Sequence, residues 1–206
     1  MKKLIEMDIK EYLDMLKSDA PAPGGGSVSA LAGAQGIGLA MMVADLTLGK
    51  EKFQDFFPIC QRVKEEGERL FENLSDSIDA DTEAFNLVAV AFKMPKDTEE
   101  DKAARSAAIQ AGTLKSTEVP FQTMKLAFEG LLLAEAMIGH SNPNCESDLG
   151  VAVLNLSAAV NGAWMNVLIN LDSLQDKTAA EKFRAQGQDI FDEANQIAHR
   201  ALKKVL

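Results

Sequence analysis

The sequence has few of the residues that build metal sites and disulfide frameworks. Its 206 residues include only two cysteines, Cys60 and Cys145, and two histidines, His140 and His199. Their spacing matches no zinc-binding pattern, so we expect no metal. The N-terminal stretch MKKLIEMDIKEYLDM turns acidic before any apolar run, which is not typical of a signal peptide. We therefore expect a cytoplasmic protein with free thiols.

Positive charge is also scarce. The chain carries 21 Lys and Arg against 31 Asp and Glu, a formal net charge of -10. This balance argues against nucleic acid and anionic membranes as partners. No stretch rich in Pro, Ser or Gly divides the middle of the chain, and 47% of the residues are hydrophobic. We expect one domain over residues 1–206 with a sizeable core.

Two uncharged stretches approach the length of a membrane span, residues 28–44 and 149–171. The first is rich in Gly and Ala, and the second carries Asn at positions 155, 161, 166 and 170. Four Asn side chains would be costly in hydrocarbon. We expect both stretches to be central helices of a soluble bundle or of a subunit interface.

Alternating β-strand patterns of useful length are missing as well, and helical periodicity runs along almost the whole chain. Helices are expected at residues 8–18, 27–48, 52–92, 98–138, 147–174 and from 178 to the C-terminus, with Asp8, Ser27, Ser147 and Thr178 as N-caps. Pro58 is expected to break the third helix early, and Pro120 to kink the fourth. The pattern predicts an all-α antiparallel bundle of about six helices with long central helices.

One acidic residue lies on an otherwise apolar stripe of the third predicted helix. At about 100° per residue the stripe contains Phe71, Leu74, Ile78, Asp81, Phe85, Val88 and Phe92. Asp79 instead shares a polar face with Glu72, Asp76, Glu83 and Asn86. Asp81 has two interpretations of equal weight: a structural hydrogen bond to a helix end or to Arg105, or an acid or base whose pKa is raised by desolvation. Asp45 poses the same question with less weight for catalysis.

Polar side chains also interrupt the fifth predicted helix. Asn155 and Asn166 are nearly eclipsed, and Asn170 follows one turn later. The pattern favours interhelical hydrogen bonds that fix register over amides that bind the edges of a flat heterocycle. Ser147 and Asp148 are typical of an N-cap followed by a favourable charge in the first turn.

The stretch PAPGGGS at residues 21–27 has three consecutive glycines before a helix. Gly24, Gly25 and Gly26 let a backbone approach a ligand closely, and free N–H groups at a helix start favour an anion. The stretch matches neither a P-loop nor a dinucleotide fingerprint, so a nucleotide phosphate is not expected. The residues alone favour a turn with Ser27 as N-cap over a site for a carboxylate or a carbonyl-bearing ring.

Five segments together resemble a known family. They are PAPGGGSVSALAGAQGIGLAMMVADLTLGK, IDADTEAFNLVAVAFKMPKDTEEDKAAR, VP at residues 119–120, SDLGVA at 147–152 and NVLINL at 166–171. In order and separation they are similar to the formiminotetrahydrofolate cyclodeaminase and methenyltetrahydrofolate cyclohydrolase family. The resemblance implies an all-α fold that forms a homodimer, and a tetrahydrofolate derivative as substrate.

The resemblance also implies roles for particular residues. The catalytic Asp falls in the segment Asp79-Ala80-Asp81, where helical phase favours Asp81 and leaves Asp79 in reserve. Substrate contacts are expected from Pro23, Gly24, Gly25, Gly26, Ser27, Lys50, Arg105, Asp148, Asn166 and Asn170. Lys50, Lys52 or Arg105 would supply positive charge near the pocket mouth. Two other functions stay open: a non-catalytic folate-binding or helical scaffold protein, and an obligate dimer whose small-residue helix serves only assembly.

Overall fold

The computed structural model describes residues 2–205, which form six α-helices and three short 3-10 helices without any β-strand in that range. In chain order they are η1 (Leu4–Glu6), α1 (Ile9–Leu16), α2 (Gly25–Leu48), η2 (Glu51–Phe56), α3 (Phe57–Phe92), α4 (Glu99–Met137), η3 (Pro143–Cys145), α5 (Glu146–Leu171) and α6 (Lys177–Val205). The predicted all-α class with about six helices is confirmed.

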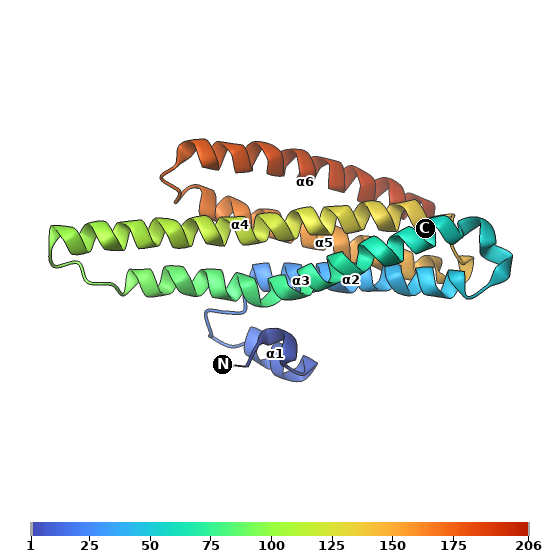
Figure 1. The fold of residues 1–206 in the computed structure, drawn as a ribbon, viewed down its shortest axis with the longest axis horizontal. Helices are drawn as coiled ribbons and strands as arrows, with labels where there is room; N and C mark the ends of the chain where they lie inside the picture. The colour runs from blue at the N-terminus through green and yellow to red at the C-terminus, as the bar shows by residue number, and fades with distance from the viewer. Residues whose placement is uncertain (1, 206) are drawn as a thin grey trace.

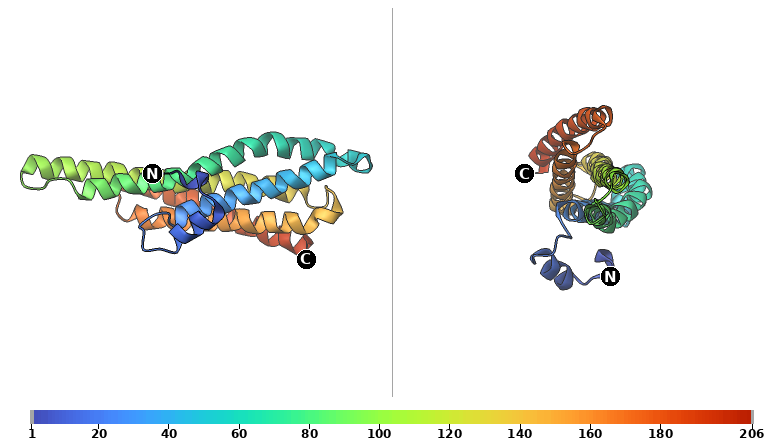
Figure 2. Two further views of the ribbon diagram at one scale, coloured as in Figure 1. Left: turned by 90° about the horizontal axis from the view of Figure 1, so that it is seen from below. Right: turned by 90° about the vertical axis from the view of Figure 1, so that its left-hand side faces the viewer.

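Four long helices, α2 to α5, build an elongated bundle (Figure 1). Helix α6 packs along α5 and α4 on one side, and α1 lies on the opposite side (Figure 2). The end of α3 and the start of α4 extend past the other helices as a hairpin. The site described below lies where α2 begins, against the middle of α3.

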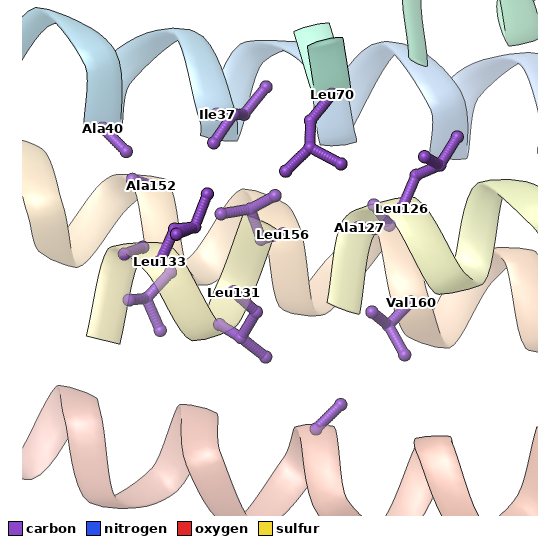
Figure 3. Packing of buried hydrophobic residues seen from close by; sticks show 14 of the residues in the cluster. Ile37, Ala40, Leu70, Leu126, Ala127, Leu131, Leu133, Ala152, Leu156 and Val160 are labelled. Atoms are coloured by element: carbon purple, nitrogen blue, oxygen red, sulfur yellow. The ribbon is translucent and has the colours of Figure 1, made fainter. Parts of the chain in front are cut away.

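The core of the bundle combines large aliphatic side chains with very small ones (Figure 3). Ile37 of α2, Leu70 of α3 and Leu156 of α5 are fully buried. Gly36 faces α5 so closely that a Cβ atom there would lie 2.6 Å from Leu156 Cγ and 2.9 Å from the Ala152 carbonyl oxygen. The Gly and Ala residues of α2 thus allow a close approach of two helix backbones.

Both uncharged stretches are helices long and apolar enough to cross a membrane by length and composition alone. They are α2 and the segment Pro143–Leu171, whose most apolar windows are 56% and 44% buried within the bundle. The predicted placement of both as central helices is confirmed, since both contribute fully buried side chains to the core.

The sequence patterns located some helix ends correctly and others not. Asp8 caps α1 and Thr98 caps α4, each in a capping box. Helix α2 begins at Gly25 with Gly24 as N-cap, so the prediction of Ser27 as N-cap is wrong. Helix α5 begins at Glu146, before Ser147. Helix α6 begins at Lys177, where the Asp176 carboxylate, not Thr178, accepts the Ala179 N–H.

Pro120 lies inside α4 without ending it, since the helix runs from Glu99 to Met137. Proline has no N–H, so it cannot donate to the carbonyl four residues earlier, which belongs to Ser116. That carbonyl accepts a hydrogen bond of 2.9 Å from Asn170 Nδ2 on α5. The side chain from a neighbouring helix therefore replaces the bond that proline removes.

The predicted apolar stripe of α3 is buried only in part. Leu74 and Ile78 are buried, whereas Phe71, Phe85 and Phe92 are 41%, 41% and 57% exposed. Phe92 ends α3 on the hairpin that extends past the other helices, so few side chains can cover it. Phe85 lines a cleft rather than the core.

Candidate active site

A cleft of about 310 Å³ lies at the start of α2, between α3, α4 and α5. Its wall combines a carboxylate, two amides and two hydroxyls with apolar surface. The lining residues are Pro21, Ala22, Gly24, Gly25, Asp81, Thr82, Phe85, Val88, Ser116, Asn166, Ile169 and Asn170. Segments from four distant parts of the chain therefore meet at one place.

The carboxylate of Asp81 occupies the N-terminal end of α2. Its Oδ2 accepts the Ser27 backbone N–H at 3.0 Å and lies 3.4 Å from the Ser27 hydroxyl. Gly24, the N-cap of α2, has no side chain to do this, so Asp81 caps the helix from α3. The structural interpretation of Asp81, a hydrogen bond to a neighbouring helix end, is confirmed.

The same carboxylate is also suited to proton transfer. Burial raises the pKa of Asp81 above its ordinary value, and the backbone and side-chain hydrogen bonds from Ser27 only partly oppose this effect. Asp81 lines the cleft, and its Oδ1, which lies against Gly26, accepts no hydrogen bond from residues 2–205. One oxygen is thus held by α2, and the other has no hydrogen-bond donor within the described chain.

The lack of a side chain at Gly26 leaves room for the Asp81 carboxylate. A Cβ atom at Gly26 would lie 1.9 Å from Asp81 Oδ1, closer than two atoms can approach. The Ser27 hydroxyl, one residue later, donates to the Ile78 carbonyl of α3 at 2.8 Å and lies 3.3 Å from Thr82 Oγ1. Small and hydroxyl side chains therefore join the start of α2 to the turn of α3 that carries Asp81.

Two amides of α5 also line the cleft. Asn170 Nδ2 donates to the carbonyls of Ser116 and Asn166, each at 2.9 Å, so the predicted interhelical bond is confirmed for this residue. Asn166 donates to Gly162 within its own helix. A Cβ at Gly25 would lie 3.1 Å from Asn166 Nδ2, so this glycine leaves room for the amide. Asn155 bonds only within α5, to Val151.

The structure brings together most of the residues predicted for the site. Gly24 and Gly25 line the cleft with Asp81, Asn166 and Asn170. Gly26 and Ser27 support Asp81 from behind and are buried, as is Pro23 of the preceding loop.

Other predicted residues lie far from this cleft within the chain. Lys50 and Lys52 follow the opposite end of α2, about 36 Å from Gly25 at the rise of an α-helix. Asp148 precedes Asn166 by about 27 Å along α5. Arg105 lies about 16 Å from Ser116 along α4, where it contacts the ring and carbonyl of Phe92. Within residues 2–205, Lys50, Lys52 and Arg105 therefore do not form the expected basic cluster at the mouth of the cleft.

Asp79 and Asp45, which the sequence left as possible catalytic residues, make contacts elsewhere in the structure. Asp79 accepts the backbone N–H groups of Leu4 at 2.7 Å and Ile5 at 3.2 Å, and so anchors the N-terminal segment to α3. Asp45 is exposed near the end of α2 and pairs with Lys64. Neither lines the cleft.

Several lining residues were not predicted as site residues. Phe85 and Val88 belonged to the predicted stripe, but periodicity alone cannot distinguish a core side chain from a cleft wall. Thr82 and Ile169 adjoin predicted residues, and Ser116 had no signal of its own. Among residues 2–205, no three His, Cys, Asp or Glu side chains gather as they would around a metal ion.

The sequence and the fold of the chain are both similar to proteins of one family. A sequence model described as formiminotransferase-cyclodeaminase matches residues 8–189. A methenyltetrahydrofolate cyclohydrolase from Methylorubrum extorquens is 38% identical over 197 residues, covering 96% of this chain and 95% of that protein. The crystal structure of a formiminotetrahydrofolate cyclodeaminase from Thermotoga maritima superposes with a TM-score of 0.80 and 28% identity, covering 97% and 94% of the two chains.

Longer proteins are also similar. A formimidoyltransferase-cyclodeaminase from Rattus norvegicus is 31% identical over 191 residues, which is 93% of this chain but 35% of the rat protein. The chain therefore spans about a third of the length of such a relative. The resemblance expected from the five sequence segments is confirmed.

Proposed function

Because the chain belongs to the formiminotransferase-cyclodeaminase family, we propose that it is a tetrahydrofolate one-carbon enzyme built around Asp81. It hydrolyses 5,10-methenyltetrahydrofolate to 10-formyltetrahydrofolate, cyclises 5-formiminotetrahydrofolate with release of ammonia, or does both. The observation that carries the proposal is a carboxylate with a raised pKa and one free oxygen in a cleft between four helices.

In hydrolysis, water attacks the cationic carbon that bridges the two folate nitrogens. The Asp81 carboxylate takes a proton from this water as the new carbon–oxygen bond forms. The bond from carbon to the ring nitrogen then breaks, and protonated Asp81 returns the proton to that nitrogen. The hydroxyl proton leaves to solvent as the formyl carbonyl forms. An ionised Asp81 also offsets the positive charge of the bridge before attack.

In cyclodeamination the Asp81 carboxylate acts on the formimino carbon of the substrate. The p-aminobenzoyl nitrogen attacks the carbon of the protonated formimino group, which becomes an amino group, and loses its own proton to Asp81. The tetrahedral carbon then expels its amino group, which receives the proton and leaves as ammonia. Both reactions need one group that accepts and returns a proton, and a raised pKa brings Asp81 closer to that working range.

The rest of the cleft supports a flat heterocyclic substrate. Phe85, Val88 and Ile169 offer apolar surface, while Asn166 and Asn170 offer amide groups. Gly24 and Gly25 let the substrate approach the backbone at the start of α2. In this proposal side chains, without a metal ion, move the proton.

Comparison of Asp81→Asn with wild type tests the proposal. Loss of the near-ultraviolet absorbance of methenyltetrahydrofolate reports hydrolysis, and ammonia release reports cyclodeamination. We expect Asp81→Asn to lower kcat by about 10²-fold or more with folate binding retained. Asp76→Asn, which removes one exposed carboxylate from the same helix, is the matched control and should keep full activity. A wild type without either activity would favour the binding or scaffold alternative.

We further propose that the protein works as a cytoplasmic homodimer that joins through α2 and α5. Exposed apolar side chains follow the outer faces of these two helices: Val28, Met42 and Leu46 on α2, and Val151, Leu154 and Met165 on α5. Each is 38–67% exposed, and burying such a surface is favourable. The net charge of -10 supports the absence of nucleic acid and of anionic membrane among its partners.

A further inference from the structure

Asn170 of α5 lines the cleft with an amide whose orientation is fixed by two backbone carbonyls. Its Nδ2 donates to the Ser116 carbonyl of α4 and to the Asn166 carbonyl of α5, each at 2.9 Å. An amide nitrogen carries two hydrogens, so both are used. The reverse orientation would place Oδ1 against two carbonyl oxygens, which can only accept hydrogen bonds. The amide of Asn170 therefore has one favourable orientation.

The bond from Asn170 to α4 depends on Pro120. In an α-helix the Ser116 carbonyl would accept the N–H of residue 120, but proline has none. The carbonyl is therefore available to the Asn170 side chain. Asn166 differs, since its Nδ2 donates to the Gly162 carbonyl of its own helix and keeps a second hydrogen. Pro120 thus occupies the hydrogen of Asn170 that would otherwise be available to a ligand.

This arrangement leaves Asn170 with an acceptor alone. Its Oδ1 accepts no hydrogen bond from residues 2–205. The atom is also not among the fully buried side-chain atoms that lack a partner, so it is accessible. Asn170 can therefore bind a ligand in the cleft only through a donor that the ligand supplies.

Ser116 carries a second polar group without a partner at this place. Its Oγ is buried and forms no hydrogen bond within the described chain. Thr113 and Thr117 on the same helix each donate to the carbonyl four residues earlier. Native structures leave few buried polar atoms unpaired. Unpartnered groups on both Ser116 and Asn170 point to a ligand that completes this part of the cleft.

Other side chains of the cleft do not supply the missing donor for Asn170. Among the described residues, no Lys or Arg lines the cleft. Asp81 adds a second oxygen, Oδ1, that accepts no bond within residues 2–205. The cleft therefore suits a ligand that carries N–H groups.

Asn170 and Asp81 lie at different levels along the bundle. Helices α3 and α4 run antiparallel (Figure 1), and a Cβ at Gly112 of α4 would lie 3.0 Å from Val88 Cγ2 of α3. Ser116, one turn further along α4, therefore lies beside the turn of α3 between Asp81 and Val88. The amide that bonds to Ser116 is thus displaced along the cleft from the carboxylate, and a flat bicyclic ring can contact both.

We propose that Asn170 is a specificity-determining residue whose Oδ1 accepts a hydrogen bond from the exocyclic amino group of the folate ring, and that Pro120 is the positioning residue for this acceptor. The amino group of a tetrahydrofolate lies at the far end of its bicyclic ring from the one-carbon bridge, where Asp81 acts. An acceptor displaced from Asp81 suits a donor at that end. The identity of the ring rests on the proposed function, but the orientation of the amide does not.

Calorimetric titration with two ligands tests the role of Asn170. The ligands are 5-formyltetrahydrofolate and its analogue with a methyl group in place of the exocyclic amino group. We expect wild type to bind the analogue about five- to tenfold more weakly, because one hydrogen bond is lost. Asn170→Ala should bind both ligands equally, because the acceptor is gone. Equal binding by wild type, or discrimination that persists in Asn170→Ala, would overturn the proposal.

Asn155→Ala is the matched control for loss of an amide from α5. The Asn155 side chain bonds to Val151 of its own helix and does not line the cleft. We expect this variant to discriminate between the two ligands as wild type does. Loss of discrimination in Asn155→Ala would overturn the assignment to Asn170.

Pro120→Ala tests the positioning role. The Ser116 carbonyl then gains a donor from its own helix, so the amide of Asn170 is held less firmly and the ratio of the two affinities should fall toward one. Reduced stability alone would weaken both ligands alike and leave their ratio unchanged. An unchanged ratio in Pro120→Ala would therefore overturn the role of Pro120.

Turnover measured on the same wild-type protein separates this proposal from the proposed function. A wild type that discriminates between the two ligands, but has neither cyclohydrolase nor cyclodeaminase activity, would refute the proposed function and support the assignment of Asn170. Equal binding of the two ligands by an active wild type would overturn the assignment of Asn170 and leave the proposed function standing.

Discussion

The carboxylate of Asp81 on α3 accepts the backbone N–H of Ser27 on α2 at 3.0 Å and caps that helix across the interior of the bundle. A negative charge at a helix N-terminus is favourable, and this effect lowers a carboxyl pKa. Burial acts in the opposite direction and is the larger effect here. The bond to α2 thus fixes the position of Asp81, while burial disfavours its ionised form. A carboxyl group in this situation is suited to exchange protons.

The cost of this charge predicts how stability depends on pH. Folding raises the pKa of Asp81, so the folded state loses stability as pH rises from the ordinary aspartate range through the raised value. Asparagine has no such cost and can still accept the Ser27 N–H. We expect Asp81→Asn to raise the free energy of unfolding by about 1 kcal/mol at neutral pH.

Urea unfolding of both proteins across pH checks this prediction. The difference should vanish below about pH 3, where aspartate is protonated in both states. A variant less stable than wild type at neutral pH would show that the hydrogen bonds from Ser27 outweigh the burial of the charge.

The close contact between Gly26 and Asp81 predicts a large effect from one methyl group. In Gly26→Ala the new Cβ would collide with Asp81 Oδ1, and the carboxylate must move. A displacement of about 1 Å can cost about 10²-fold in rate, so we expect a comparable loss of kcat. Gly38→Ala on the same helix is the control, because its Cβ would lie 3.6 Å from the nearest atom and alanine favours a helix.

Steady-state kinetics and thermal unfolding of the two glycine variants separate the effects. Gly38→Ala should keep its activity and gain about 0.5–1 kcal/mol. If Gly26→Ala retained full activity, the position of Asp81 would not matter for the reaction.

The bond from Asn170 to the Ser116 carbonyl predicts coupling between Asn170 and Pro120. Asn170→Ala leaves a partly buried carbonyl without its partner, at a cost of about 1 kcal/mol. In Pro120→Ala the new N–H can donate to that carbonyl, so the same Asn170→Ala change should cost less there. A double-mutant cycle of unfolding free energies measures the coupling, which we expect to be about 1 kcal/mol. Additive effects would contradict this explanation of how α4 tolerates proline.

The proposed homodimer predicts an effect of charge on the outer face of α5. Leu154 is 53% exposed, and Leu154→Glu would place a charge in the interface. We expect the dimer to dissociate at least about tenfold more readily. Sedimentation velocity over a range of concentrations measures this. Gln186→Glu, an exposed position of α6, adds the same charge elsewhere and should leave the oligomeric state unchanged.

Local patterns in the sequence predicted those features that depend on neighbours along the chain. Asp8 was predicted as the cap of α1, and its own side chain bonds the next turn of that helix. The helical phase of α3 placed Asp81 inward because periodicity reports which face is covered. Neither inference needed knowledge of another helix.

Features that depend on contacts between distant segments were not predictable in this way. The cap of α2 comes from a residue 54 positions away, so Ser27 was assigned a role that Asp81 fulfils. Phe85 follows the apolar period but faces a cleft. Lys50 and Asp148 were assigned by resemblance, and only the lengths of α2 and α5 show how far they lie from Asp81 in one chain.

The cap between α3 and α2 also bears on the order of folding. Closing a loop of 54 residues has an entropic cost, so we expect this contact to form after the helices have met. Until then the backbone N–H of Ser27, in the first turn of α2, has no acceptor. Its hydrogen should therefore exchange with solvent. A partly assembled chain would therefore contain every helix and still hold no formed catalytic centre.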